Sequence, residues 1–293
     1  MCGRSRSERA GDFEDGLLTL PLLDVMDWQE LHGNWVLIPD RPIALIHFLG
    51  GAFVATAPQL TYRRLLERLA LEGYGIIATP FVNTFDHRAI AQTVYRNFNR
   101  AVAVLEETQL RRRSLPIYGI GHSMGCKLHL LIGSLFTVER AGNILISFNN
   151  SAARDAVPLV EQVSSVMTQF SSLLTSVAPD LAVEFTPTPQ ETRQIVAQQY
   201  QVPRNLLIRF RNDTIDQTRE LNMLLSDRFP EMVIARTLAG THLTPLGPDV
   251  NWQAGDSFAP WDAIAQWMRQ EVYRDLHQLE RHILQWLDPI GTR

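Results

Sequence analysis

The stretch Gly121-His122-Ser123-Met124-Gly125 decides how the rest of the chain is interpreted. It has the pattern G-x-S-x-G, it directly follows the apolar run 115–121, and it precedes a helical pattern over 126–136. A serine in a tight turn between a strand and a helix is called a nucleophile elbow, because the turn lifts the hydroxyl above the strand ends. The glycines leave room for so tight a turn. The alternative is a glycine-rich turn in which the serine has no chemical role.

Short apolar runs and helical patterns alternate on both sides of this turn. This alternation predicts an α/β fold with a mostly parallel central sheet and helices on both faces. The expected strands are 35–39, 43–49, 75–79, 115–121, 143–148, 206–210 and 232–238. The expected helices are 59–72, a long helix capped by Asp86, 126–136, 217–229 and 261–286. In the first of these helices, Leu60, Leu65, Leu66 and Leu69 have the spacing of a buried face.

The alternation pauses between residues 151 and 203, where the pattern is mostly helical with an apolar stripe. We therefore expect four segments: a tail and lead-in (1–32), a first part of the core (33–150), a helical cap insertion (151–203) and a second part of the core (204–293). The stripe suggests an apolar acyl or isoprenoid substrate, or else it only packs the cap onto the core.

Composition narrows the class of protein. The chain has 293 residues, a net charge of −4 and 45% hydrophobic residues, which excludes intrinsic disorder and argues against nucleic-acid binding. No stretch is apolar enough to span a membrane and no signal peptide is evident, so we expect a cytoplasmic protein. A peripheral contact of Arg111, Arg112 and Arg113 with anionic lipid is an alternative to a merely solvated helix end. The oligomeric state is left open.

We expect neither a cofactor nor a metal ion, because the sequence contains no phosphate-binding loop, no dinucleotide fingerprint and no metal-ligand spacing. Cys2 and Cys126 are too few for a disulfide framework and suggest a reducing compartment. We expect Cys126, inside the helix after the serine, to be buried and inert.

A serine nucleophile needs a base, and His242 is the best candidate. It follows the last expected strand in the loop 239–245, whose small residues can present an imidazole over the sheet edge. We expect His122 to point away from the serine, and we expect His129, His277 and His282 to be helical residues without a catalytic role.

The base needs an acidic partner, which should follow the strand 206–210. Two aspartates compete in that loop. Asp213 comes first after the strand, whereas Asp216 can instead cap the helix that begins at about residue 217. The sequence gives their order but not their geometry, so both stay candidates.

An oxyanion hole is the fourth expected element. One donor is the backbone N–H of Met124, the residue after the serine. The second should come from the loop His47-Phe48-Leu49-Gly50-Gly51, with the N–H of Leu49 as the first choice. The alternative is that Gly50 and Gly51 only reverse the chain direction.

These four elements occur in the order found in the α/β-hydrolase superfamily, which the chain resembles over residues 35–287. It resembles most closely an uncharacterised α/β-hydrolase-like family of cyanobacteria and plant plastids. The matching segments are 47–53, 121–125, 146–150 and 240–245. Two positions depart from common superfamily patterns: Phe48 stands where a glycine is frequent, and the apolar segment 80–85 replaces a charged motif.

The resemblance implies a serine hydrolase of carboxylic esters or thioesters, acting on a small acyl ester or a lipid-like molecule. Ser123, His242 and Asp213 or Asp216 would form the triad. An acyltransferase would use the same residues but would exclude water and pass the acyl group to an alcohol or a thiol. A non-catalytic binding or assembly protein that reuses the fold is the third hypothesis, favoured if Phe48 blocks the oxyanion loop.

Overall fold

The central element is a sheet of eight strands. The computed structural model describes residues 26–52, 54–110, 113–152, 184–247 and 261–289, with side chains of the last helix from Tyr273 onward. The spatial order is β1-β2-β4-β3-β5-β6-β7-β8, and all neighbours from β4 to β8 are parallel. The strands are β1 (Gln29–Leu31), β2 (Asn34–Leu37), β3 (Ala44–Leu49), β4 (Tyr74–Ala78), β5 (Ile117–His122), β6 (Gly142–Ile146), β7 (Asn205–Phe210) and β8 (Val233–Leu238).

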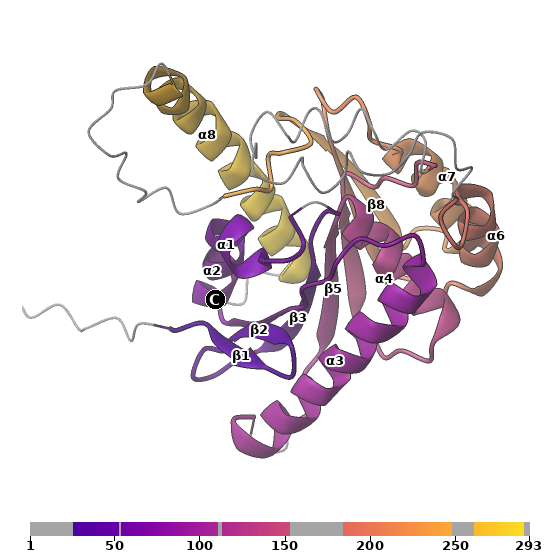
Figure 1. Ribbon diagram of the computed structural model, residues 1–293, viewed down its shortest axis with the longest axis horizontal. Helices are drawn as coiled ribbons and strands as arrows, with labels where there is room; N and C mark the ends of the chain where they lie inside the picture. Colours follow the sequence, from indigo (N-terminus) through magenta and orange to yellow (C-terminus); the bar gives the residue numbers. More distant parts are fainter. Residues whose placement is uncertain (1–25, 53, 111–112, 153–183, 248–260, 290–293) are drawn as a thin grey trace, which may run out of the picture.

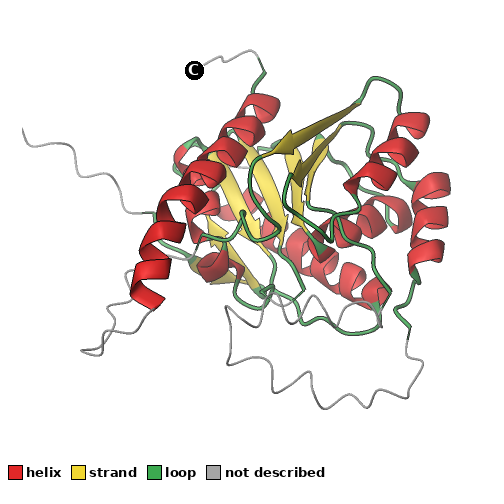
Figure 2. Cartoon of the chain, turned by 90° about the horizontal axis from the view of Figure 1, so that it is seen from above, coloured by secondary structure: helices red, strands yellow, loops and turns green. Residues whose placement is uncertain are grey.

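Helices cover both faces of this sheet (Figures 1 and 2). The described helices are α1 (Pro58–Thr61), α2 (Arg63–Leu71), α3 (His87–Thr108), α4 (Met124–Leu135), α6 (Pro189–Gln199), α7 (Thr218–Arg228) and α8 (Trp261–Leu287). Successive residues of β3 pack on opposite faces, as the pleat of a strand requires. Ile46 and Phe48 join the cluster that contains α2 and α8, whereas Leu45 and Leu49 contact residues of α3 and α4. This architecture confirms the expected α/β-hydrolase fold.

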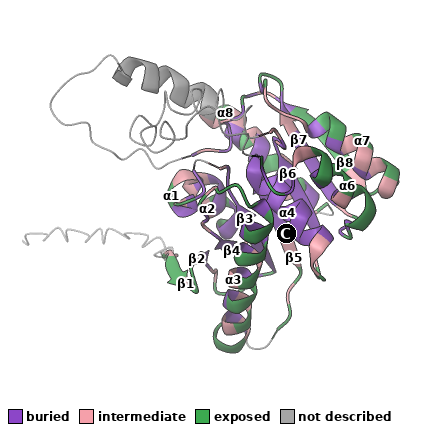
Figure 3. Cartoon of the chain, turned by 45° about the vertical axis from the view of Figure 1, so that its right-hand side comes forward, coloured by how far each residue is buried: buried purple, intermediate pink, exposed green. Residues whose placement is uncertain are grey.

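The central strands are uniformly apolar because they are covered on both faces. Every residue of β3, β4 and β6 is buried. The same holds for α4, which is buried over almost its whole length and lies between the sheet and its helical neighbours (Figure 3). The turn before α4 therefore joins a strand of the sheet to a buried helix.

The first predicted helix differs from expectation. The expected helix 59–72 is divided at Tyr62 into α1 and α2. Leu65, Leu66 and Leu69 are buried as expected, but the prediction for Leu60 is wrong, since 55% of its surface is exposed. The interruption rotates α1 relative to α2, so Leu60 does not lie on the buried face that Leu65, Leu66 and Leu69 form. β2 overlaps the expected strand 35–39, but β1 and the antiparallel pairing of β2 with β4 were not expected.

Most of the expected cap, including its apolar stripe, lies outside the described residues. In the described remainder, Val196 of α6 packs in a cluster with Leu130 of α4 and Leu207 of β7. Residues 189–199 therefore contact the helical layer of the core. In α8, Leu276, Leu279 and Ile283 are buried, as expected.

Candidate active site

Ser123 lies in a strained turn between β5 and α4. Its φ of 53° and ψ of −117° place a non-glycine residue in the left-handed half of conformational space. Such a conformation costs free energy and persists only where the surroundings enforce it. Here the Ser123 N–H donates to the Ile146 carbonyl at 2.9 Å, which ties the turn to β6. The Ser123 side chain makes no capping bond to α4, so its hydroxyl is not used to stabilise the helix.

The two glycines of the turn are required by close backbone contacts. A Cβ on Gly121 would lie 2.6 Å from the backbone nitrogen of Cys126. A Cβ on Gly125 would lie 2.0 Å from the Leu49 carbonyl oxygen. Any side chain at Gly125 would therefore push α4 away from β3. The G-x-S-x-G pattern is thus a packing requirement of this elbow.

His242 and Asp213 are in direct contact. The Nδ1 of His242 lies 2.8 Å from Oδ2 of Asp213, and both residues are buried. A carboxylate accepts, so Nδ1 donates and leaves Nε2 of His242 without a proton when the ring is neutral. The other carboxylate oxygen, Oδ1, accepts from the Ile215 N–H at 3.1 Å. This arrangement orients an imidazole whose free nitrogen can act as a base.

The two candidate acids have opposite electrostatic environments. Burial disfavours ionisation of Asp213, but hydrogen bonding and the charge of His242, with the Ser147 hydroxyl and the Ile215 N–H, outweigh it and hold its pKa below the ordinary value. Burial raises the pKa of Asp216, the Thr218 hydroxyl opposes that rise, and the nearby Asp213 charge adds to it. Asp213 is therefore the carboxylate that is more readily ionised.

Asp216 lies one residue before the N-cap position of α7, which Gln217 occupies. Its carboxylate still accepts from Thr218, the first residue of that helix, through the hydroxyl and the backbone N–H. Its other oxygen lies 3.5 Å from Nε of Arg209. The carboxylate of Asp216 therefore lies against Thr218 and near Arg209, whereas the carboxylate of Asp213 binds His242.

The loop after β3 lies against the serine, but Leu49 does not face it. The Leu45 N–H donates to the Pro116 carbonyl next to β5, and residues two apart in a strand point their N–H groups in the same direction. Leu49, which pairs with Gly121 of β5, therefore directs its N–H into the ladder. A Cβ on Gly51, by contrast, would lie 3.5 Å from Cβ of Ser123. The choice of Leu49 as oxyanion donor is thus contradicted by its place in the strand.

Phe48 does not enter the loop. Its side chain is fully buried and contacts the Tyr62 ring, with ring centroids 4.7 Å apart, on the face of the sheet that α2 covers. The Phe48 side chain therefore does not obstruct the neighbourhood of Ser123.

His122 was expected only to point away from Ser123, and its contacts with other residues were not predicted. Its ring lies beside that of His242, with centroids 4.9 Å apart, and its Nε2 lies 2.9 Å from the His242 carbonyl oxygen. Its Nδ1 lies 2.7 Å from the hydroxyl of Tyr62, a residue that the sequence did not single out. A tyrosine in an apolar helix start gives no signal of such a contact.

The family model described as "Protein of unknown function (DUF1350)" matches residues 27–289. The chain belongs to this family. Among solved structures, a carboxyl esterase 2 of the fungus Tuber melanosporum is similar at 17% identity, with a TM-score of 0.51, over 86% of this chain and 87% of that chain. An esterase of Pyrococcus furiosus is similar at 16% identity, with a TM-score of 0.50, over 74% and 83% of the two chains. A comparison with curated proteins finds no match.

In this DUF1350 member, the helix that follows Ser123 carries two buried titratable side chains, Cys126 and Lys127. The Cys126 thiol donates to the carbonyl oxygens of Gly121 and Ile146, and burial raises its pKa well above the ordinary value. The thiol is therefore protonated and unreactive. Lys127, the only lysine of the chain, donates to the Pro187 carbonyl at 3.2 Å.

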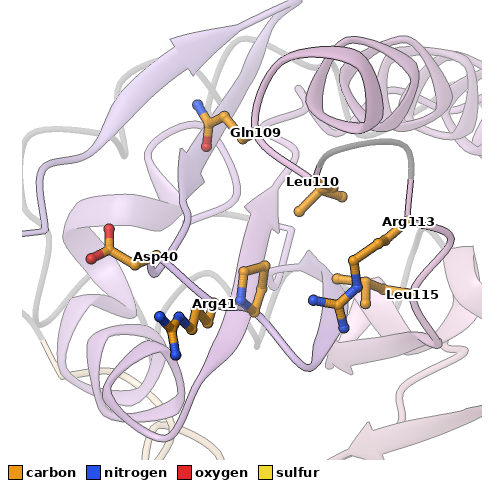
Figure 4. Close-up of a pocket in the computed structure, with 7 residues that line it drawn as sticks. Asp40, Arg41, Gln109, Leu110, Arg113 and Leu115 are labelled. Atoms are coloured by element: carbon orange, nitrogen blue, oxygen red, sulfur yellow. The ribbon is translucent and has the colours of Figure 1, made fainter.

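A cavity of about 470 Å³ in this DUF1350 member is remote from Ser123. It is lined by Asp40, Arg41, Pro42, Gln109, Leu110, Arg113 and Leu115 (Figure 4). These residues precede β3 and β5 or follow α3, so the cavity lies at the amino ends of the parallel strands, whereas Ser123 follows the carboxyl end of β5.

Two further properties concern the described part of the chain. Its His, Cys, Asp and Glu side chains form no group of three or more that could hold a metal ion. None of its helices combines the length and apolar character needed to cross a membrane.

Proposed function

We propose that the protein is a serine hydrolase that cleaves carboxylic esters or thioesters through an acyl-enzyme. The observation that carries the proposal is the 2.8 Å contact between His242 and Asp213, on loops that follow parallel strands at the same sheet edge as the strained Ser123. A nucleophile, a base and a carboxylate that orients the base make up a catalytic triad, which is recognised by geometry rather than by sequence order.

The proposed reaction has two stages. The Ser123 hydroxyl attacks the acyl carbonyl carbon while Nε2 of His242 takes its proton, and the proton then passes to the leaving alcohol or thiol as the acyl-enzyme forms. A water molecule, deprotonated by Nε2 of His242, then attacks the acyl-enzyme. The carboxylic acid is released, and His242 returns the proton to the Ser123 oxygen. Asp213 stays ionised throughout and stabilises the positive charge on His242.

The developing oxyanion needs two N–H donors. Met124 supplies the first, at the start of α4. In the loop after β3, the Gly51 N–H is bound to the Tyr62 hydroxyl at 2.8 Å, so the next N–H along the chain, that of Ala52, is proposed as the second donor.

A fluorophosphonate probe tests this proposal. The wild type should be labelled, and Ser123→Ala should not be. Ser134→Ala is the matched control, because Ser134 is a buried serine of the same helix whose hydroxyl donates to the Leu130 carbonyl at 2.7 Å. It should be labelled like the wild type. An unlabelled wild type, or a labelled Ser123→Ala, would contradict the proposal.

We propose further that the acyl group is apolar. The loop after β4 lies at the same sheet edge as the elbow, and in it Phe81 packs in one cluster with Met124. Val82 and Phe85 of this loop are exposed to 68% and 42%. Such large exposed apolar side chains near a proposed site favour an apolar ligand.

An ester series from acetyl to dodecanoyl tests the acyl preference. Val82→Asp should lower kcat/KM for dodecanoyl esters more than for acetyl esters. Met223→Asp is the control, because Met223 of α7 is similarly exposed, at 62%, but lies outside this loop. Equal losses for both esters would contradict the proposed preference.

Three finer expectations stay predictions. They are the membership in the family of cyanobacteria and plant plastids, the cytoplasmic location, and the contact of residues 111–113 with anionic lipid. Arg111 and Arg112 lie outside the described residues.

A further inference from the structure

Three consecutive hydrogen bonds connect the loops that carry the proposed catalytic groups. The Gly51 nitrogen lies 2.8 Å from the Tyr62 hydroxyl oxygen. That hydroxyl lies 2.7 Å from Nδ1 of His122, and Nε2 of His122 lies 2.9 Å from the His242 carbonyl oxygen. The connection therefore runs from the loop after β3, past the residue before Ser123, to the loop after β8. We call it the Tyr62–His122 bridge.

The direction of every bond in this bridge is determined. A carbonyl oxygen can only accept, so Nε2 of His122 carries a proton. Burial, together with the nearby His242, lowers the pKa of His122 to about 3, against the opposing effects of the His242 carbonyl and the Asp213 charge, and the ring is neutral. Its Nδ1 therefore accepts from the Tyr62 hydroxyl. The Tyr62 oxygen in turn accepts from the Gly51 N–H.

The bridge is closed to water. Tyr62 is fully buried, and His122 is exposed to only 2%. Burial raises the pKa of Tyr62 well above its ordinary value, so its hydroxyl keeps the proton that it donates. When a buried hydrogen-bonding group loses its partner, no solvent molecule replaces that partner, and the group must move or stay unsatisfied.

We infer that Tyr62 and His122 are positioning residues that set the distance between the oxyanion loop and the base loop around Ser123. The inference rests on the proposed hydrolase function. Parallel ladders fix the strands themselves, but Gly51 and His242 lie in loops beyond the strand ends. The bridge is a connection between these two loops, and it passes through the residue next to the nucleophile.

Loss of the bridge should affect the transition state more than substrate binding. The oxyanion donors and the base act only while the tetrahedral intermediate forms and decomposes, so their displacement lowers kcat and leaves KM nearly unchanged. Displacements of about 1 Å in a catalytic group cost on the order of 10²-fold in rate.

The test compares two variants that each remove one buried tyrosine hydroxyl. Tyr62→Phe removes the central group of the bridge. Tyr200→Phe is the matched control: Tyr200 is also fully buried, and its hydroxyl accepts from Asn143 at 2.7 Å and donates to Asn205 at 2.8 Å, in the cluster around α6 and β7. For each variant, kcat, KM, the thermal midpoint and the end-point of fluorophosphonate labelling are measured. The end-point counts the folded chains with an intact nucleophile.

We expect Tyr62→Phe to lose about 10- to 100-fold in kcat per labelled site, with KM changed less than about twofold, whereas Tyr200→Phe keeps its kcat. Unchanged kcat in Tyr62→Phe, or equal kcat losses in both variants, would overturn the inference while leaving the hydrolase function intact. An unlabelled wild type would instead overturn the hydrolase function.

A second variant keeps the test decisive if Tyr62→Phe is poorly folded. His122→Gln replaces the imidazole by an amide of different reach, and it breaks the same connection at a different atom. The double variant should lose no more kcat than the worse single variant, because both changes act on one connection. Multiplicative losses would show that the two residues act separately and would overturn the bridge.

Discussion

Asp213 and Asp216 are separated by two residues in the loop after β7, yet their carboxyl groups have opposite ionisation tendencies. Both are buried, and burial alone would raise both pKa values. Asp213 binds the imidazole of His242, whereas Asp216 binds Thr218, lies near Arg209 and meets the negative charge of Asp213 itself. The contact with His242 therefore distinguishes the carboxylate that is suited to orient a base.

This difference predicts unequal effects on catalysis. Asp213→Asn should lower kcat by about 10³- to 10⁴-fold, because an amide at this position no longer fixes the His242 tautomer. Asp216→Asn should change kcat by less than about tenfold, since its partners are Thr218 and Arg209. Ester hydrolysis by the two purified variants provides the measurement. A larger loss in Asp216→Asn would reverse the assignment.

At the scale of residues, the sequence was informative where a short pattern determines the local chemistry. Ser123, His242 and Asp213 follow strands in a recognisable order. Tyr62 and the orientation of His122 could not be derived, because their contacts depend on how α2 approaches β5, some 60 positions away in the chain. The end of β3 was expected at the correct residue, but Leu49 was chosen wrongly because the pairing of its N–H with β5 depends on the register of the two strands, which the sequence does not specify.

Among the elements, α4 is the one whose position is most tightly restricted. Gly125 lets its first turn contact β3, since only a hydrogen fits against the Leu49 carbonyl. Gly51, in the loop opposite, is less crowded: a Cβ there would meet its nearest neighbour, Nδ1 of His122, at 3.3 Å.

These contacts predict different outcomes for the two alanine variants. Gly125→Ala should lower the free energy of unfolding by more than about 3 kcal/mol, because backbone atoms must move apart. Gly51→Ala should cost less than half of that, because only side chains need to adjust. Urea unfolding monitored by circular dichroism compares them. Similar midpoints for Gly125→Ala and the wild type would refute the packing argument.

Lys127 on the same helix should make stability depend on pH. Burial lowers its pKa to about 7, while an unfolded lysine titrates near pH 10.4. Between these values the unfolded chain binds more protons than the folded chain, so the destabilisation by Lys127 is complete below about pH 7 and decreases as the pH rises above it. Lys127→Met should therefore gain more over the wild type in urea midpoint at pH 7 than at pH 9.5. A difference independent of pH would show that the buried amine is not responsible.

The order and type of the central elements were predictable because strands buried on both faces are continuous apolar runs, and the helices between them have a clear period. The break at Tyr62 was not predictable, since no proline or glycine marks it and the side chain turns inward to reach His122. β2 overlaps the expected strand 35–39, whereas β1 was missed because it has only three residues and none of them is buried.

For the molecule as a whole, one sheet joins parts of the chain that are far apart in sequence. The buried residues of α8 pack in the same cluster as α2 and the central strands, which come from the first half of the chain. Because this cluster includes residues from Leu37 to Leu287, the two halves should stabilise each other.

This shared cluster predicts that truncating one buried aliphatic side chain of α8 lowers the stability of the whole protein. Ile283→Ala should lower the free energy of unfolding by about 2–5 kcal/mol, since Ile283 is fully buried. Gln285→Ala, an exposed position of the same helix, is the control and should stay within about 0.5 kcal/mol. Urea denaturation gives both values. A small effect of Ile283→Ala would show that α8 is not part of the core.

Two neighbouring residues of α4 can also serve as chemical probes of local opening. Cys126 donates its thiol toward the sheet, whereas Lys127, the only lysine, donates toward the segment around Pro187. In a Cys2→Ser background, a thiol reagent would react only when α4 separates from the sheet, and an amine reagent would modify Lys127 only when the opposite wall opens. The two modification rates would thus measure, in one sample, how often each side of the helix behind Ser123 opens.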